Sequence, residues 1–222
     1  MSEPKHSDPE ADSMTSTRYQ DYVIRDGKYI GRFEDMYRNA KEVPWHQDET
    51  VSAIFSDLTV VILKHRHIRS LLDVGCGMGY MAERLRRELP GLNRVVGLDI
   101  SETAVACAAE MFPDIEFVAG TLDNLSLEDR FDVVVSKDVL WYVLDNLPSY
   151  LAGLALRSSR WVYLGQSFPD KRPFYGEEIL PNAQSLLAYL EKQGYSVVYS
   201  LVERDAAYSD REYAHALIEV SQ

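Results

Sequence analysis

Residues 71–80 read LLDVGCGMGY, and this stretch decides the fold. Apart from Asp73, its first four residues are apolar, as is typical of a short buried strand. Three glycines at alternating positions follow, and glycine allows backbone conformations that a side chain would obstruct. The next segment, MAERLRRELP, has a helical pattern. Strand, glycine turn and helix predict the first crossover of a nucleotide-binding α/β sheet, whose ligand lies beyond the carboxyl ends of the strands.

Apolar periodicity on both sides of this stretch predicts a repeat of strands and helices. Residues 50–64 have apolar side chains at spacings of three and four, which predicts a helix that covers the sheet. The last two predicted strands are joined by a polar segment without a helical pattern, so we expect them to form an antiparallel hairpin. We predict strands at 71–74, 94–99, 115–118, 131–136, 160–166, 195–202 and 214–220, and further helices at 78–89, 101–111, 144–157 and 182–193.

These elements predict an α/β fold class: a doubly wound, mostly parallel, seven-stranded Rossmann-like sheet with an antiparallel edge hairpin. Residues 1–18 are rich in Ser, Asp, Glu and Pro and are expected to form a disordered tail. Residues 19–49 form an aromatic N-terminal arm or lid, and residues 50–222 form the ligand-binding domain. Within the arm, the Asp-Gly pair of VIRDGKYIGRF indicates a hairpin turn. The arm aromatics either close over a ligand or simply pack on the domain.

Composition argues against a nucleic-acid partner. The 222 residues include 23 Lys and Arg against 35 Asp and Glu, and the net charge is −12. Such a chain repels polyanions, and no basic cluster in it is strong enough to reverse this. Cys76 and Cys107 are expected to be free thiols, which fits the reducing cytoplasm. We find no apolar signal region and no apolar run long enough to cross a bilayer, so we predict a soluble cytoplasmic protein without membrane association.

A second predicted strand, VVGLD at 95–99, ends in an acidic residue. This residue, Asp99, lies 20 residues after Gly79. An acid at this position can accept hydrogen bonds from both hydroxyls of a ribose that lies across the sheet edge. Ser101 is expected to cap the helix that follows. The Gly-x-Gly-x-Gly spacing differs from the Gly-x-Gly-x-x-Gly form of dinucleotide sites, and no Lys-Ser or Lys-Thr pair is present to hold a triphosphate.

The sequences DVGCGMG at 73–79 and GLDIS at 97–101 resemble those of class I S-adenosylmethionine-dependent methyltransferases. The resemblance extends over about 50–220, because FVAGTLDNL and FDVVVSKDVLWYV occupy the places of the family's third and fourth strands with their loops. The implied cofactor is S-adenosyl-L-methionine, with S-adenosyl-L-homocysteine as the product. The arm also resembles the leading segment of small-molecule methyltransferases of the bacterial polysaccharide and nodulation-factor type.

The resemblance assigns roles to individual residues. The acid of the first strand contacts the methionine portion of the cofactor in this family, a role that falls on Asp73. Gly75 and Gly77 would let the backbone approach the amino acid portion, and Asp99 would bind the ribose. The cofactor-binding residues that we predict are Asp73, Gly75, Cys76, Gly77, Gly79, Asp99, Ile100, Thr121, Leu122, Ser136 and Trp45.

The adenine end departs from the family pattern. Many members have an acid directly after the glycine of the third-strand loop, whereas here Gly120 is followed by Thr121. Thr121 could accept a hydrogen bond through its hydroxyl, and Asp123 could reach the ring from two positions further on. Leu122 could supply a backbone N–H and an apolar wall. Ile100 is the expected apolar wall on the other side of the ring.

Methyl transfer is an in-line displacement, in which placing the acceptor and excluding water supply much of the catalysis. An amine or hydroxyl acceptor must also lose a proton, so a general base is expected. We favour His46, which lies in PWHQ at the junction of the arm and the first core helix. The other base candidates are Tyr37, Asp138, Tyr142 and His215. The predicted catalytic residues are His46, Lys137, Asp138 and Tyr142, and no metal site is predicted.

Lys137 and Asp138 could equally form an ion pair with a structural role. The predicted function is S-adenosylmethionine-dependent methyl transfer to an amine or hydroxyl of a small molecule, with sugar or aminoalcohol precursors as the implied class. The alternatives are a methyltransferase acting on RNA or protein and a non-catalytic S-adenosylmethionine-binding protein. A homodimer is compatible with the sequence and is not predicted by it.

Overall fold

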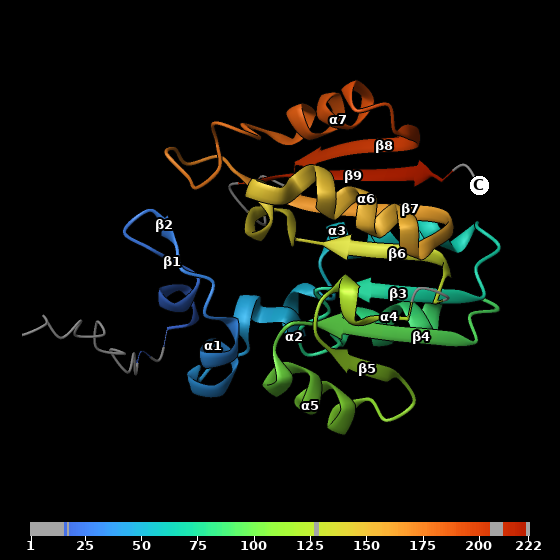
Figure 1. Cartoon of the computed structure of the whole chain (residues 1–222), viewed down its shortest axis with the longest axis horizontal. Coiled ribbons are helices and arrows are strands. Elements are labelled where there is room, and N and C mark those ends of the chain that lie inside the picture. The colour runs from blue at the N-terminus through green and yellow to red at the C-terminus, as the bar shows by residue number, and fades with distance from the viewer. Residues whose placement is uncertain (1–15, 17, 127–128, 205–210, 221–222) are drawn as a thin grey trace, which may run out of the picture.

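A computed structural model describes residues 16, 18–126, 129–204 and 211–220. The main strands are β3 (Ser70–Val74), β4 (Arg94–Asp99), β5 (Glu116–Ala119), β6 (Phe131–Lys137), β7 (Ser158–Pro169), β8 (Ser196–Arg204) and β9 (Arg211–Glu219). They form one seven-stranded sheet in the order β5-β4-β3-β6-β7-β9-β8 (Figure 1). Neighbouring strands run parallel except at β9, which is antiparallel to both β7 and β8. The predicted fold class and its edge hairpin are confirmed.

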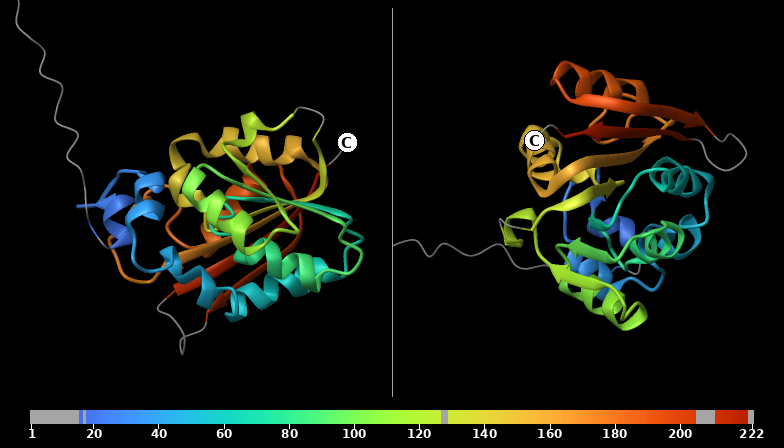
Figure 2. Two further views of the ribbon diagram at one scale, coloured as in Figure 1. Left: turned by 90° about the horizontal axis from the view of Figure 1, so that it is seen from below. Right: turned by 90° about the vertical axis from the view of Figure 1, so that its right-hand side faces the viewer.

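Helices cover both faces of this sheet (Figure 2). They are α3 (Ile54–Lys64), α4 (Tyr80–Glu88), α5 (Glu102–Met111), α6 (Leu147–Arg157) and α7 (Ala183–Lys192). Successive strand residues point to opposite faces, so Leu71 and Leu72, both fully buried, belong to two different cores. Leu71 packs in the cluster beneath α3 and α4, and Leu72 packs in the cluster beneath α6 and α7. Burial on both faces explains why these strands read as continuous apolar runs.

The N-terminal arm lies beyond the carboxyl ends of β3, β4 and β6 (Figure 1). It consists of η1 (Tyr19–Tyr22), β1 (Ile24–Arg25), β2 (Lys28–Tyr29), α1 (Phe33–Asn39), η2 (Pro44–His46) and α2 (Gln47–Thr50). β1 and β2 form the predicted hairpin, and Asp26 and Gly27 both have positive φ in its turn. Tyr22, Phe33 and Met36 form a small separate core of the arm. Of the predicted tail, residues 1–15 and 17 lie outside the described residues.

Two predicted helices begin later than expected. The helix predicted at 50–64 starts at Ile54, because the chain turns between α2 and α3, where the Ser56 hydroxyl donates to the Thr50 carbonyl over 2.9 Å. The helix predicted at 144–157 opens with the 3-10 turn η5 (Leu144–Asn146), and α6 proper has Pro148 in its first turn. Three-ten turns also form at η3 (Leu122–Asn124) and η4 (Leu140–Tyr142).

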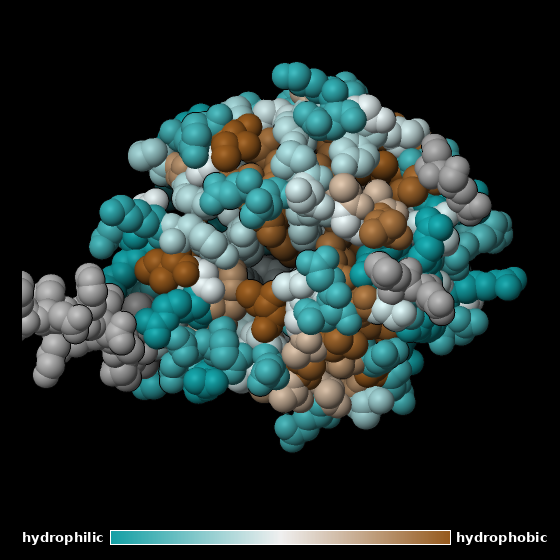
Figure 3. All heavy atoms as spheres, in the orientation of Figure 1, coloured by the Kyte–Doolittle hydropathy of each residue, from teal (hydrophilic) through white to brown (hydrophobic). Residues whose placement is uncertain are grey.

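The surface near the carboxyl ends of the strands is hollowed. Figure 3 shows a hollow near the middle of the face seen in Figure 1, bordered by hydrophobic residues within a largely hydrophilic surface. In an open parallel sheet, ligands bind in the crevice outside the carboxyl ends of the strands. The arm and the loops after β3, β4, β5 and β6 therefore delimit the region in which a ligand site is expected.

Candidate functional site

The glycine turn after β3 has a backbone that requires glycine. Gly75, Gly77 and Gly79 have φ values of 75°, 54° and 82°, in the left-handed region that other residues rarely adopt. The N–H groups of Gly75 and Cys76 donate to the carbonyl of Leu98 over 2.7 and 3.1 Å, so the turn is tied to the end of β4. Two predicted site residues, Gly75 and Cys76, are thus brought directly beside the end of β4.

Asp99 ends β4 and faces this turn. One of its carboxylate oxygens accepts from the Gly77 N–H over 2.9 Å, and the other accepts from the Ser101 N–H over 3.0 Å. The Ser101 hydroxyl in turn caps α5 by accepting from the Ala104 N–H, as predicted. The carboxylate is therefore held at the junction of the two loops, where it retains lone pairs that can accept from a ribose.

Asp73 is the deepest acid of the site. Its side chain is 2% exposed, and its Oδ2 atom has no hydrogen-bond partner among the described residues. Burial raises the pKa of Asp73 to about 7, with a lowering contribution from Lys137 and a raising one from Asp99. A buried polar atom without a hydrogen-bond partner costs free energy, so a ligand that brings a hydrogen-bond donor or a positive charge would stabilise it. The unpartnered Oδ2 atom of Asp73 therefore fits a contact with the methionine portion of S-adenosylmethionine.

Gln47 and Tyr37 from the arm form a roof over Gly77. The Gln47 side-chain oxygen accepts from the Met78 N–H over 3.0 Å, and its amide nitrogen donates to the Tyr37 hydroxyl over 3.2 Å. A Cβ atom placed on Gly77 would lie 2.2 Å from that nitrogen and 2.6 Å from the Tyr37 oxygen. Sequence reasoning considered Tyr37 only as a base and missed Gln47, although Gln47 directly follows the Pro-Trp-His sequence that marked the region.

Glu34 anchors the arm to the first turn of α5. Its carboxylate accepts from the Ser101 hydroxyl over 2.7 Å and from the Thr103 hydroxyl over 2.6 Å. Burial alone would raise the pKa of Glu34, but the hydrogen bonds from Thr103 and Ser101, together with nearby Arg38, outweigh it and lower the pKa to about 2. A negative side chain also suits the positive end of a helix. No sequence motif marked this anchor.

The expected adenine end has an exposed apolar side chain and a tightly held loop. Ile100 is 54% exposed, unusually open for an isoleucine that directly follows a buried strand. The N–H of Thr121 donates to the Asn124 side chain over 2.6 Å in a capping box. The Leu122 carbonyl accepts from the Arg157 guanidinium over 2.7 Å. Asn124 and Arg157, neither of them predicted, therefore shape the loop in which Thr121 and Leu122 lie.

Lys137 and Asp138 form an ion pair at the end of β6. The Lys137 ammonium lies 3.1 Å from the Asp138 Oδ2 atom and 4.4 Å from the centre of the Phe55 ring. Asp138 also accepts from the Tyr213 hydroxyl over 3.1 Å and from the Ser167 N–H over 2.9 Å. Burial raises the pKa of Asp138, but the Lys137 charge and the Ser167 N–H outweigh it, so the net pKa is lowered. The structural ion pair that the sequence left open is present.

Aromatic side chains from three segments meet at the outer edge of the site. We call Tyr29, Phe33, Trp45, Tyr142 and Tyr175 the aromatic rim. Tyr29 stacks between Tyr142 and Tyr175, with ring centroids 6.1 and 5.9 Å apart. Phe33 and Trp45 approach the Tyr142 ring at 5.0 and 5.9 Å. The structure therefore brings predicted residues Trp45 and Tyr142 together, and the arm meets the loop after β6 there.

His46 lies apart from this group. It is exposed, and its ring lies edge-on to Tyr19 with centroids 6.0 Å apart. Ser136, another predicted residue, is buried and its hydroxyl shares a 2.8 Å hydrogen bond with the Tyr150 hydroxyl of α6. Cys76 is a buried free thiol and Cys107 is also free, as expected. The assignment of His46 as a base remains a prediction.

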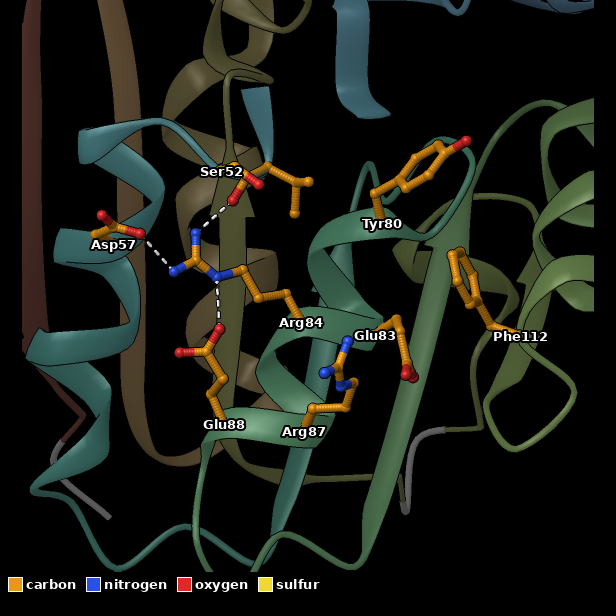
Figure 4. Close-up of a pocket in the computed structure, with 9 residues that line it drawn as sticks. Ser52, Asp57, Tyr80, Glu83, Arg84, Arg87, Glu88 and Phe112 are labelled. Atoms are coloured by element: carbon orange, nitrogen blue, oxygen red, sulfur yellow. Dashed lines mark hydrogen bonds and ion pairs between the residues drawn. The ribbon is translucent and has the colours of Figure 1, made fainter. Parts of the chain in front are cut away.

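A second hollow, about 400 Å³ in volume, lies between α3 and α4 (Figure 4). Arg84 spans it, bonding to the Val51 carbonyl, to Asp57 over 2.5 Å and to Glu88 over 2.8 Å. None of the residues that line it belongs to the predicted site. Arg84 joins the turn before α3 to α4, so these contacts fix the base of the arm on the helix that follows the glycine turn.

Two other features are absent from the parts of the chain that the structure describes. No helix among the described residues is both long enough and apolar enough to cross a membrane. In residues 16, 18–126, 129–204 and 211–220, no three His, Cys, Asp or Glu side chains gather in a way that could hold a metal ion.

Comparison with known proteins identifies similar chains. Residues 71–156, from β3 to the end of α6, match the sequence model of a methyltransferase domain. The malonyl-[acyl-carrier protein] O-methyltransferase of Bacillus cereus is 26% identical over 52% of this chain and 45% of its own length. The dTDP-4-amino-2,3,4,6-tetradeoxy-D-glucose N,N-dimethyltransferase of Saccharopolyspora spinosa is 31% identical over 46% of this chain and 43% of its own length. The chain thus spans about half the length of the curated relatives it matches.

Among solved structures, the fold resembles that of the N-methyltransferase NodS from Bradyrhizobium japonicum WM9 in complex with S-adenosyl-L-homocysteine. The TM-score is 0.61 and the sequence identity is 15%, and the match covers 82% of this chain and 94% of NodS. At this identity the likeness concerns the fold. The overall fold is therefore one that a known methyltransferase also has.

Proposed function

We propose that this chain, whose residues 71–156 form a methyltransferase domain of the class I S-adenosylmethionine-dependent type, transfers a methyl group to a small molecule. The observation that carries the proposal is the unpartnered, buried Oδ2 atom of Asp73 beside the glycine turn. Asp73 and Asp99, which ends the next strand, together place two carboxylates at one end of the sheet. This set of acceptors matches a ligand with a cationic amino acid portion and a ribose.

The predicted cofactor residues divide the ligand among them. Asp73 and the backbone of Gly75 and Gly77 would hold the methionine portion, Asp99 the ribose, and Ile100 one face of adenine. When bound, S-adenosylmethionine supplies an activated methyl group on a sulfonium. The residues of this chain would orient that group and exclude water, because Gln47 and the aromatic rim roof the carboxyl edge.

We propose an amine or hydroxyl of a small molecule as the acceptor, with sugars and aminoalcohols as the first classes to test. The aromatic rim offers ring faces on which a sugar or a cationic amine can pack. Lys137 and Asp138 lie at the tip of β6, where a second ligand would approach the cofactor. His46, Tyr142 and Asp138 remain the proposed proton acceptors. We also propose that residues 19–49 act as a lid over the site. The proposed location of the protein is the cytoplasm.

The first experiment tests the cofactor. Thermal unfolding of the protein is followed with S-adenosylmethionine, S-adenosylhomocysteine or NAD, because a ligand that binds only the folded state raises its melting temperature. We expect stabilisation by the first two and none by NAD. Asp73→Asn should remove the shift, whereas Asp114→Asn, at an exposed acid between α5 and β5, should keep it. Stabilisation by NAD alone would overturn the proposal.

A second experiment tests turnover. Release of S-adenosylhomocysteine is measured over a panel of amino sugars, aminoalcohols and hydroxylated precursors, with transfer RNA and a protein mixture as additional acceptors. Turnover with a small molecule supports the proposed acceptor class. Turnover only with RNA or protein would replace it with the macromolecular alternative, and cofactor binding without any turnover would favour a non-catalytic binding protein.

A further inference from the structure

Arg157, the last residue of α6, is a buried cation bound to backbone carbonyls. Its side chain is 4% exposed. One guanidinium nitrogen donates to the carbonyls of Leu122 over 2.7 Å and Leu125 over 3.0 Å, and another donates to the carbonyl of Ser126. Within the described residues, every hydrogen bond of the Arg157 side chain is to the main chain of this one loop. Among the described residues, Leu122 is the predicted cofactor-binding residue that Arg157 bonds, and the bond is to its main-chain carbonyl.

Such an arrangement fixes the path of the loop. A buried guanidinium is stable only when its N–H groups are bonded, so the three carbonyls must stay turned toward it. Charge-assisted hydrogen bonds are about twice as strong as neutral ones, and the planar fork of arginine adds directionality. One turn earlier in α6, a Cβ on Gly153 would lie 3.1 Å from the Leu122 Cδ1 atom, so the helix also approaches this side chain closely. The Arg157 side chain therefore binds the main chain of the loop, and the backbone of α6 at Gly153 packs close to the Leu122 side chain.

The geometry points to Arg157 as a positioning residue that sets the adenine specificity of the site through the loop from Thr121 to Ser126. The inference rests on the proposed function, because Thr121 and Leu122 are the residues expected at the adenine end. Since the carbonyl of Leu122 already accepts from Arg157, we expect adenine to be read by other groups of the loop, namely the N–H groups of Leu122 and Asp123 and the Thr121 hydroxyl. The hydrogen bonds from Arg157 to the three carbonyls set the direction in which these groups of the loop point.

The test uses two variants and a control. Arg157→Met removes the donors at similar length, and Arg157→Lys keeps the charge but cannot reach three carbonyls. Leu190→Ala, a fully buried residue of α7, serves as the control that lowers stability far from the loop. For each protein, calorimetry gives the dissociation constants of S-adenosylhomocysteine and of S-inosylhomocysteine, in which the adenine amino group is replaced. Amide hydrogen exchange of residues 120–126 is measured without ligand.

We expect the wild-type protein to prefer S-adenosylhomocysteine. In Arg157→Met the dissociation constant should rise about tenfold, the effect of roughly one lost charged hydrogen bond, and the preference over the inosyl compound should shrink. Exchange of residues 120–126 should accelerate, and Arg157→Lys should fall between. Leu190→Ala should keep both the affinity and the preference while losing thermal stability.

Two outcomes would overturn the inference, and they distinguish its failure from the failure of the proposed function. If wild-type protein binds S-adenosylhomocysteine and Arg157→Met matches Leu190→Ala in affinity, preference and loop exchange, Arg157 is only structural and the cofactor proposal stands. If wild-type protein binds neither compound, the cofactor proposal fails and the adenine role of Arg157 fails with it.

Discussion

Two carboxylates of the arm and sheet, Asp73 and Glu34, have pKa values shifted in opposite directions. Asp73 is buried without a partner for one oxygen, and its pKa is raised to about 7. Glu34 accepts hydrogen bonds from two hydroxyls, and its pKa is lowered to about 2. The difference follows from burial and from hydrogen bonding, because Asp73 is buried whereas the Glu34 side chain is 37% exposed, and donors stabilise the charged form that burial disfavours. The acid left without donors is the one expected to meet the ligand.

The raised pKa of Asp73 predicts a pH dependence of cofactor binding. The ammonium group of the ligand's amino acid portion requires an ionised Asp73, so a protein in which Asp73 is protonated must release a proton to bind. We expect the dissociation constant of S-adenosylhomocysteine to level off above about pH 7 and to rise at lower pH, approaching tenfold per pH unit. Calorimetric titration between pH 5.5 and pH 8.5, with about 0.5-unit steps, measures this. Asp73→Asn should bind weakly with no such slope, and an identical slope in Asp73→Asn would contradict the assignment.

At Gly77, backbone conformation and crowding can be separated by experiment. Alanine at Gly77 would have a φ of 54° and a Cβ 2.2 Å from the Gln47 amide nitrogen. Gly91 has a φ of 82° and nothing within 4 Å of such a Cβ, so Gly91→Ala reports the backbone effect alone. We expect both variants to lose about 1–2 kcal/mol of unfolding free energy from backbone strain. Only Gly77→Ala should also lose binding of S-adenosylhomocysteine, measured by calorimetry, and equal binding in both variants would argue against close packing of the arm on the turn.

At the scale of elements, the sheet could be predicted from the sequence and the arm contacts could not. Buried strands have a local apolar signature, and the glycine turn after β3 is a local motif, so both are visible without knowledge of the fold. The contacts of Glu34, Gln47 and Arg157 join residues 31 to 69 positions apart. Nothing in a local pattern indicates such partners. For the same reason the helix predicted at 50–64 includes residues 51–53, which form a turn before α3 whose Val51 carbonyl accepts from Arg84 of α4.

The Glu34 anchor predicts an acid-sensitive attachment of the arm. Its folded-state pKa is about 2 against a usual 4.5, so the attachment is strongest above pH 4.5 and weakens as the pH falls toward 2. Glu34→Gln should loosen α1 already at neutral pH, because an amide oxygen accepts more weakly from Ser101 and Thr103. Amide exchange of residues 33–39 should then accelerate. Glu49→Gln, an exposed acid of α2, is the control, and equal protection in all three proteins would exclude an anchoring role.

Across the whole molecule, a buried polar strip crosses the face beneath α3. His215 of β9 is fully buried, with its Nδ1 atom 2.7 Å from the Tyr163 hydroxyl, which shares a 2.7 Å hydrogen bond with Thr59 of α3. Burial lowers the pKa of His215 to about 4, with a lowering contribution from Lys137 and a raising one from Asp138. The histidine therefore belongs to the packing between α3 and the antiparallel edge, and it is neutral in the folded protein.

His215 and Asp73 together predict the acid profile of stability without cofactor. A histidine with a pKa of about 4 folded and 6.5 unfolded binds its proton first in the unfolded chain, so stability falls as the pH drops from 6.5 to 4. Asp73, with a pKa of about 7 folded and 3.8 unfolded, has the opposite sign: it is neutral in the folded chain, and stability falls as the pH rises from 3.8 to 7. Between pH 4 and 6.5 the folded and unfolded states thus differ by one proton at each site, in opposite directions.

Between pH 4 and 6.5 the effects of His215 and Asp73 on the pH dependence of stability should cancel. Each effect should reappear when the other group is removed in a single variant. We expect the urea-unfolding free energy of the wild-type protein to change little from these two groups between pH 4 and 6.5. His215→Asn should leave stability falling as the pH rises, and Asp73→Asn should leave it falling as the pH drops, each by up to about 1.4 kcal/mol per pH unit. The double variant should be flat again. Parallel profiles for the two single variants would mean that these buried groups do not titrate with opposite signs.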